Sequence, residues 1–119
     1  MLIRRLAECS EFVAGDGTVL REYLHPERQQ VDLRYSLAHA SLRPGRASLR
    51  HRLSVSEVYC ILEGEGRMTI DSESLFVAKG DVVYIPPGST QSIECLGDAE
   101  LRFLCIVDPA WKPEIETVG

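Results

Sequence analysis

The sequence lacks the features that mark several classes of protein. No apolar stretch is long enough to span a bilayer, and residues 1–6 are too polar for a secretory signal. The basic residues form no run of like charge, and the net charge is −5. Because nucleic acids and anionic membranes attract basic proteins, neither is an expected partner. These absences leave a soluble cytoplasmic protein as the expectation.

Several chemical motifs are missing as well. The chain has no phosphate-binding loop, no Ser-His-Asp order and no pair of catalytic carboxylates. Its four cysteines include no C-x-x-C pair, which excludes the common zinc and thioredoxin-like patterns. They are Cys9, Cys60, Cys95 and Cys105. Three fall inside strand-like runs, where a reduced cysteine acts as a small apolar filler.

Sustained helical periodicity is also absent, and short strand-like runs occupy the chain instead. They lie at residues 19–24, 35–42, 55–62, 67–70, 75–78, 82–85, 91–95 and 100–107. Turn residues separate them, and residues 71–74 are expected to turn a hairpin. The spacing predicts an all-β sandwich or barrel, and 119 residues fit one domain over residues 1–119. Residues 1–6 fit a strand or a short helix, and the tail from Asp108 fits an irregular surface strap.

Two stretches share a frame of glycine and proline around polar residues. The first runs Gly45, five residues, His51-Arg52-Leu53, three residues, Glu57, six residues, Gly64. The second runs Gly80, five residues, Pro86-Pro87-Gly88, two residues, Gln91, three residues, Cys95. This frame resembles the two sequence motifs of the cupin superfamily, and every glycine and proline of those motifs is in register.

The resemblance implies a fold and a set of metal-ligand positions. The implied fold is the cupin double-stranded β-helix, a jelly-roll barrel. The positions that hold a metal in the family are His51, Leu53, Glu57 and Gln91 here. Two keep the family's residue, whereas leucine and glutamine replace two histidines. The fold expectation is unaffected by these replacements, but the metal chemistry depends on them.

Strand alternation indicates which side chains share the barrel interior. Successive side chains of a strand point to opposite faces, so an inward His51 brings Leu53, Glu57 and Tyr59 to the same face. In the last long strand the same phase predicts that Phe103 and Cys105 line the cavity together with Leu53. Similarity to the family places the small residues at 36, 38 and 40 inward as well, which leaves room for a ligand.

Two interpretations of the polar set remain open. In the first, His51, Glu57 and Gln91 hold a divalent ion such as Mn²⁺, Fe²⁺, Zn²⁺ or Ni²⁺, because one nitrogen and two oxygen donors suit such ions. The protein would then be a metal-dependent enzyme on a small polar metabolite, with Glu57 or Tyr59 assisting proton transfer. In the second, His51 and Gln91 hydrogen-bond Glu57 without a metal, and the barrel is a non-catalytic small-molecule binder or sensor.

The remaining expectations concern two histidines and assembly. His25, before a proline, is expected to be an exposed turn residue, and His39 to face the outer side of its sheet. The outward residues Val58, Cys60 and Leu62 form an apolar row that needs cover, which predicts a homodimer. Small members of the resembled family similarly pair through their sheets and exchange N-terminal strands.

Overall fold

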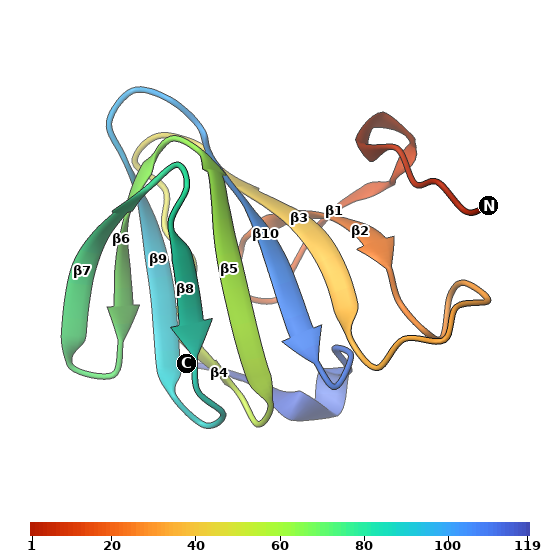
Figure 1. The fold of residues 1–119 in the computed structure, drawn as a ribbon. Helices are drawn as coiled ribbons and strands as arrows, with labels where there is room; N and C mark the ends of the chain where they lie inside the picture. Colours follow the sequence, from red (N-terminus) through yellow and green to blue (C-terminus); the bar gives the residue numbers. More distant parts are fainter.

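The computed structural model describes residues 1–119 as two antiparallel β-sheets that face each other (Figure 1). The six-stranded sheet has the order β1 (Glu11–Val13), β2 (Val19–Leu24), β3 (Ser36–Leu42), β10 (Leu101–Asp108), β5 (Ser56–Glu63), β8 (Val82–Ile85). The five-stranded sheet has the order β11 (Glu116–Val118), β4 (His51–Leu53), β9 (Thr90–Leu96), β6 (Glu65–Ile70), β7 (Glu73–Ala78). Two short 3-10 turns, Leu6–Glu8 and Pro113–Ile115, complete the structure. The all-β prediction is confirmed, and no helix is long and apolar enough to cross a membrane.

The long strands were predictable because they alternate strongly. β2 and β8 have the predicted bounds, and β3, β5, β9 and β10 differ from them by one residue at one or both ends. The β6–β7 hairpin turns on two residues rather than four, with Asp71 at a φ of 52°. The tail is not wholly irregular, because its end forms β11 and pairs with β4. Strands of three residues are too short to carry a recognisable alternation, so this pairing had no sequence signal.

The packed core lies between the two sheets. Tyr59, Ile61 and Phe103 are at most 3% exposed, and the rings of Tyr59 and Phe103 lie 4.6 Å apart. Ile93 of the facing sheet belongs to the same cluster. Burying each large apolar side chain stabilises the fold by about 1.5–3 kcal/mol. As predicted, alternate residues of β5 and β10 face the barrel interior. The inward face of each strand therefore carries both core residues and cavity-lining residues.

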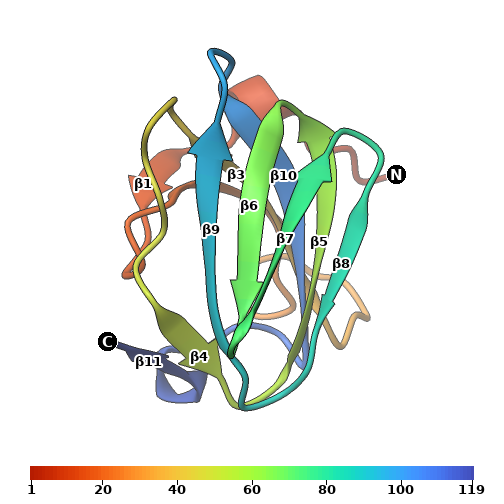
Figure 2. The same ribbon diagram turned by 90° about the vertical axis from the view of Figure 1, so that its left-hand side faces the viewer.

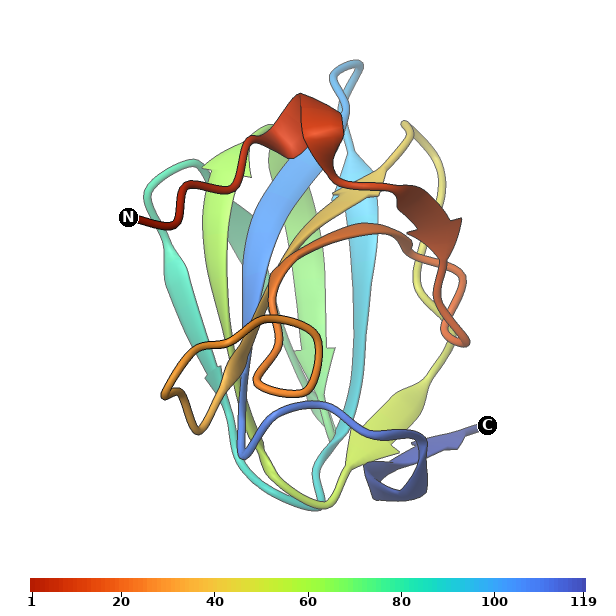
Figure 3. The ribbon, with the colours of Figure 1, turned by 90° about the vertical axis from the view of Figure 1, so that its right-hand side faces the viewer.

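The N-terminal hairpin and the C-terminal tail meet beside β4. Figure 3 shows the turn between β1 and β2 next to the start of β4 and the chain end, and Figure 2 shows the same proximity from the opposite side. The Leu49 amide donates to the Asp16 carbonyl at 2.6 Å, which ties the hairpin turn to the segment before β4. The register of β11 on β4 pairs Glu116 with Leu53. Segments far apart in the sequence therefore converge on one edge of the five-stranded sheet.

The structure corrects the expectation for His25 and explains the placement of His39. His25 is only 2% exposed, since its Nε2 donates to the Trp111 carbonyl (2.7 Å) and its Nδ1 accepts from the Glu27 amide (3.1 Å). The tail folds back over the turn, a long-range contact that the local sequence does not indicate. His39 faces away from the cavity, as predicted, but the N-terminal segment helps to bury it, and burial lowers its pKa.

Candidate functional site

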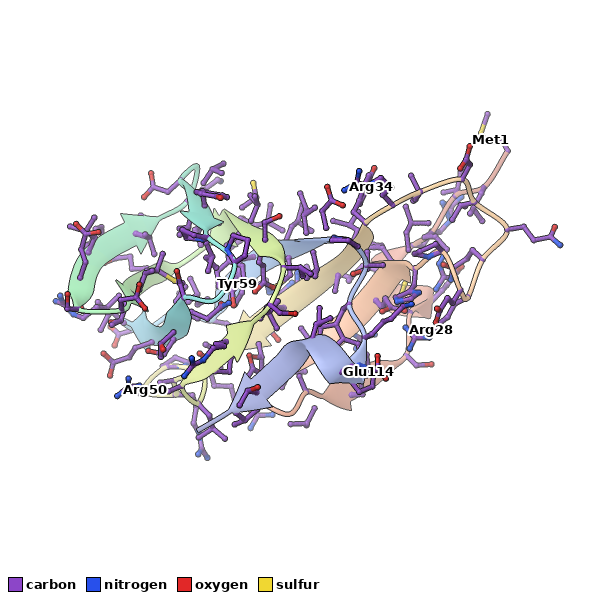
Figure 4. The ribbon with its side chains drawn as sticks, turned by 90° about the horizontal axis from the view of Figure 1, so that it is seen from below. Met1, Arg28, Arg34, Arg50, Tyr59 and Glu114 are labelled. Carbon is purple, nitrogen blue, oxygen red and sulfur yellow. The ribbon has the colours of Figure 1, made fainter.

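A cavity of about 330 Å³ adjoins the packed core and shares Tyr59, Phe103 and Cys105 with it. Figure 4 views the molecule from below, with Tyr59 labelled between the two sheets and the C-terminal segment beside β4. The apolar part of the wall includes Phe12, Leu20, Leu53, Phe103, Cys105, Val107 and Trp111. The polar part includes Asp16, Glu22, Arg28, Ser36, His51, Glu57, Tyr59 and Glu116. An apolar wall with a few convergent polar groups is the usual form of a small-molecule site.

Glu57, Gln91 and Tyr59 form a hydrogen-bonded chain on the inner wall, called here the inner cluster. The Tyr59 hydroxyl donates to Gln91 Oε1 at 3.0 Å, and Gln91 Nε2 donates to Glu57 Oε1 at 3.0 Å. All three side chains are buried, Gln91 to the point of 1% exposure. Both ends of the Gln91 amide therefore have protein partners. No fully buried side-chain nitrogen or oxygen lacks a partner, so the second Glu57 oxygen reaches the open cavity.

The inner cluster is uncharged near neutral pH. Burial away from water raises the pKa of Glu57 to about 8, against the lowering effect of the Gln91 hydrogen bond. Nearby Asp16 and Glu116 raise the pKa of Glu57 further. Burial also raises the pKa of Tyr59 and of Cys105 well above their ordinary values. Glu57 is thus a protonated acid at pH 7, and Cys105 is a protonated thiol of low nucleophilicity.

His51, the first residue of β4, faces a different set of partners. Its Nδ1 lies 2.8 Å from the Leu49 carbonyl, which can only accept, so Nδ1 carries a hydrogen. Its Nε2 lies 3.3 Å from Asp16 Oδ2. The ring is 3% exposed, so both nitrogens have fixed directions. His51 is therefore not hydrogen-bonded to Glu57, although the metal-free interpretation of the sequence expected that bond.

Asp16 and Glu116 join His51 in an outer cluster that the sequence did not reveal. One ligand atom from each of the three side chains lies within 4.8 Å of the other two. Asp16 Oδ1 accepts from the amide (2.9 Å) and the hydroxyl (2.6 Å) of Thr18, and Glu116 Oε1 accepts from Trp111 Nε1 (2.8 Å). Asp16 lies in a Gly-Asp-Gly turn and Glu116 in the tail, both outside the motifs. Only the tertiary pairing brings them to His51.

The four motif positions are a poor fit to a metal ion in this arrangement. Leu53 lines the cavity but offers no donor atom, and the Gln91 amide is already bonded at both ends. Burial raises the pKa of Glu57 to about 8 in the metal-free protein, so an ion bound here would have to displace a proton. The hydrogen bond between Gln91 and Glu57 favours the metal-free interpretation of these positions. Ligation by His51, Glu57 and Gln91 stays a prediction that metal titration can decide.

Comparisons with other proteins agree with this architecture. Residues 38–107 match the family of the cupin domain. An uncharacterised protein of Methanocaldococcus jannaschii is 40% identical over 104 residues, which cover 87% of this chain and 82% of that protein. The chain belongs to the cupin family. The resemblance seen in the two motifs is thus confirmed, and the two facing sheets are the cupin jelly roll.

This cupin is also similar to proteins named for oxalate. An oxalate-binding protein of Thermotoga maritima is 28% identical over 99 residues, which cover 82% of each chain. The structure of a predicted oxalate decarboxylase from the same organism superposes with a TM-score of 0.80 at 23% identity, covering 91% of this chain and 99% of that one. The structural likeness shows the shared fold.

Proposed function

We propose that this cupin binds a small polar metabolite in the barrel cavity and orients it with the inner cluster. The observation that carries the proposal is the free oxygen of Glu57, which opens into a largely apolar cavity of about 330 Å³. A protonated Glu57 donates a hydrogen bond, and the Tyr59 oxygen, whose hydrogen is used by Gln91, can accept one. A donor beside an acceptor suits a ligand hydroxyl group, which has both functions.

The same pair supports the catalytic roles predicted for Glu57 and Tyr59. A general acid works best when its pKa lies near the operating pH, and the pKa of Glu57 is about 8. Glu57 would give a proton to a bound metabolite and recover it, with Tyr59 holding the reacting group. Binding without catalysis requires only these hydrogen bonds. A catalytic role and a sensing role for this protein would therefore share the same contacts and differ only in whether the bound metabolite is converted.

A carboxylate ligand is the second candidate, favoured by the oxalate-binding relative. The cavity is acidic, however, because Asp16, Glu22 and Glu116 line it and Arg28 is paired with Glu22. A dianion would be repelled by these groups unless a cation lay between them. The electrostatics therefore favour a neutral hydroxylated metabolite for the metal-free protein.

Retention of metabolites by protein with a blocked cavity tests the proposal. Ala38 lies on the cavity wall, so Ala38→Phe should fill the space, whereas Leu37→Phe on the outward face of β3 is the matched control. Each protein is incubated with a mixture of small polar metabolites, desalted and denatured, and the released compounds are identified by mass spectrometry. Wild type and Leu37→Phe should retain the same compound, and Ala38→Phe should not. Equal retention by Ala38→Phe would refute binding in the cavity.

We propose in addition that two copies pair through the outer face of the six-stranded sheet. The register places Val58 beside Tyr84 and Cys60 beside Val82, and Val82 and Tyr84 are more than 60% exposed. Such a continuous apolar face is costly in water and is the predicted dimer surface. Light scattering should report a dimer at micromolar concentration, and Tyr84→Glu should shift it to a monomer. A monomeric wild type would contradict the pairing.

A further inference from the structure

We propose that Asp16, His51 and Glu116 form a divalent-metal site at the edge of the cavity, displaced from the four motif positions of the cupin barrel. The three ligand atoms lie within 4.8 Å of one another. Two ligands bound at about 2.0–2.1 Å to a tetrahedral ion are about 3.3 Å apart. His51 Nε2 and Asp16 Oδ2 are separated by 3.3 Å, which matches that edge.

The orientation of His51 is the independent observation that points to a cation. With Nδ1–H donated to the Leu49 carbonyl, Nε2 is the ring nitrogen left to bind an ion, and it lies 3.3 Å from Asp16 Oδ2. Glu116 contributes a second carboxylate to the same group of ligand atoms. Metal-bound histidines in proteins are typically fixed in this way, with the other ring nitrogen donating to a carbonyl or carboxylate. The ring is nearly fully buried, so it cannot turn away.

Each carboxylate is also held by a second group. Thr18 binds Asp16 through Oδ1, which leaves Oδ2 facing His51, and the Trp111 indole binds Glu116 through Oε1. Hydrogen bonds of this kind fix the direction of metal-binding carboxylates. One imidazole and two carboxylates suit Zn²⁺, Mn²⁺ or Fe²⁺. The set combines three segments that are distant in the sequence, namely the β1–β2 turn, β4 and β11.

The position of this site relates it to the cavity. All three residues line the cavity wall, so coordination positions that the protein does not fill would face a bound molecule. An ion there would offset the acidic charge of the cavity and admit a small carboxylate. Only this statement about a carboxylate ligand rests on the proposed function. The metal site itself is tested without any organic ligand, so the two proposals can fail separately.

Calorimetric titration of tag-free, chelator-treated protein with ZnCl₂ and MnCl₂ tests the site. Asp16→Asn and Glu116→Gln keep the size of each side chain and an oxygen for Thr18 or Trp111, but remove the charge. Each should weaken metal binding at least tenfold. Glu114→Gln is the matched control, because Glu114 is an exposed carboxylate in the same tail, and it should bind one ion per chain like wild type. Glu57→Gln separates this site from ligation by His51, Glu57 and Gln91.

Three outcomes would overturn the proposal. Wild type that binds no ion would refute the site. Loss of binding in Glu57→Gln with full binding in Asp16→Asn would assign the ion to the motif positions. Circular dichroism checks that each variant is folded.

Crystals of the unaltered protein soaked in MnCl₂ provide a test that needs no variant. The anomalous peak of the bound ion should lie about 2.0–2.3 Å from ligand atoms of Asp16, His51 and Glu116. A peak elsewhere, or none, would contradict the site.

Discussion

The inner and outer clusters both contribute side chains to the wall of one cavity but differ in the way the chain holds them. The inner cluster of Glu57, Tyr59 and Gln91 comes from long strands and is closed by its own hydrogen bonds. The outer cluster of Asp16, His51 and Glu116 comes from a turn and two three-residue strands, and one ligand atom of each side chain lies within 4.8 Å of the other two. Burial raises the pKa of Glu57 to about 8, so the inner cluster is held together by neutral hydrogen bonds.

The largest expected effect comes from the proton on Glu57. Because the folded protein binds this proton more tightly than the unfolded chain, its contribution to stability is full below pH 4.5 and is lost as the pH rises to about 8. Raising the pKa from 4.5 to about 8 corresponds to about 5 kcal/mol across that window. The glutamine of Glu57→Gln cannot ionise. The free energy of unfolding of the variant, measured in urea, should therefore rise relative to that of wild type by up to about that amount as the pH rises. A constant difference between the two proteins would contradict a neutral Glu57.

An intermediate effect is expected from removing the link between the acid and the phenol. Gln91→Leu preserves volume but leaves Glu57 and the Tyr59 hydroxyl without their partner, which should cost about 2–4 kcal/mol of unfolding free energy at pH 6. Chemical denaturation measures the loss, and Ser92→Ala on the outward face of β9 is a control with little expected effect. A loss below about 0.5 kcal/mol would mean that the inner cluster is not closed by these bonds.

The smallest effect is expected for the outer cluster in metal-free protein. Glu116→Gln keeps the acceptor for the Trp111 indole and removes one of two carboxylates that face His51. In the presence of a chelator its unfolding free energy should therefore change by less than about 1 kcal/mol. Thermal or urea unfolding checks this value. A loss above about 2 kcal/mol would show that Glu116 forms a strong ion pair within the protein and would remove the contrast between the clusters.

The sequence predicted the parts of the molecule that depend on local alternation and on the motif frame. Glu57, Tyr59, Phe103 and Cys105 share inward faces because side chains of long strands alternate. Asp16 and Glu116 could not be placed, because their positions depend on a hairpin turn docking near Leu49 and on β11 pairing with β4.

His25 was wrongly expected in solvent for the same reason. The carbonyl that it binds belongs to Trp111, in a tail that folds back over the turn from the far end of the chain. Local turn chemistry indicates where the chain reverses, but not which distant segment covers the reversal.

The protonation state of Glu57 tests most directly whether the inner cluster is neutral and distinct from the outer cluster. Carbon-13 nuclear magnetic resonance of glutamate carboxyl groups, followed as a function of pH and assigned by comparison with Glu57→Gln, gives the titration midpoint of this side chain alone. The account predicts a midpoint of about 8, raised by burial. A midpoint near the ordinary value of 4.5 would mean that Glu57 is ionised at neutral pH. That result would contradict a neutral inner cluster and would favour His51, Glu57 and Gln91 as the metal ligands.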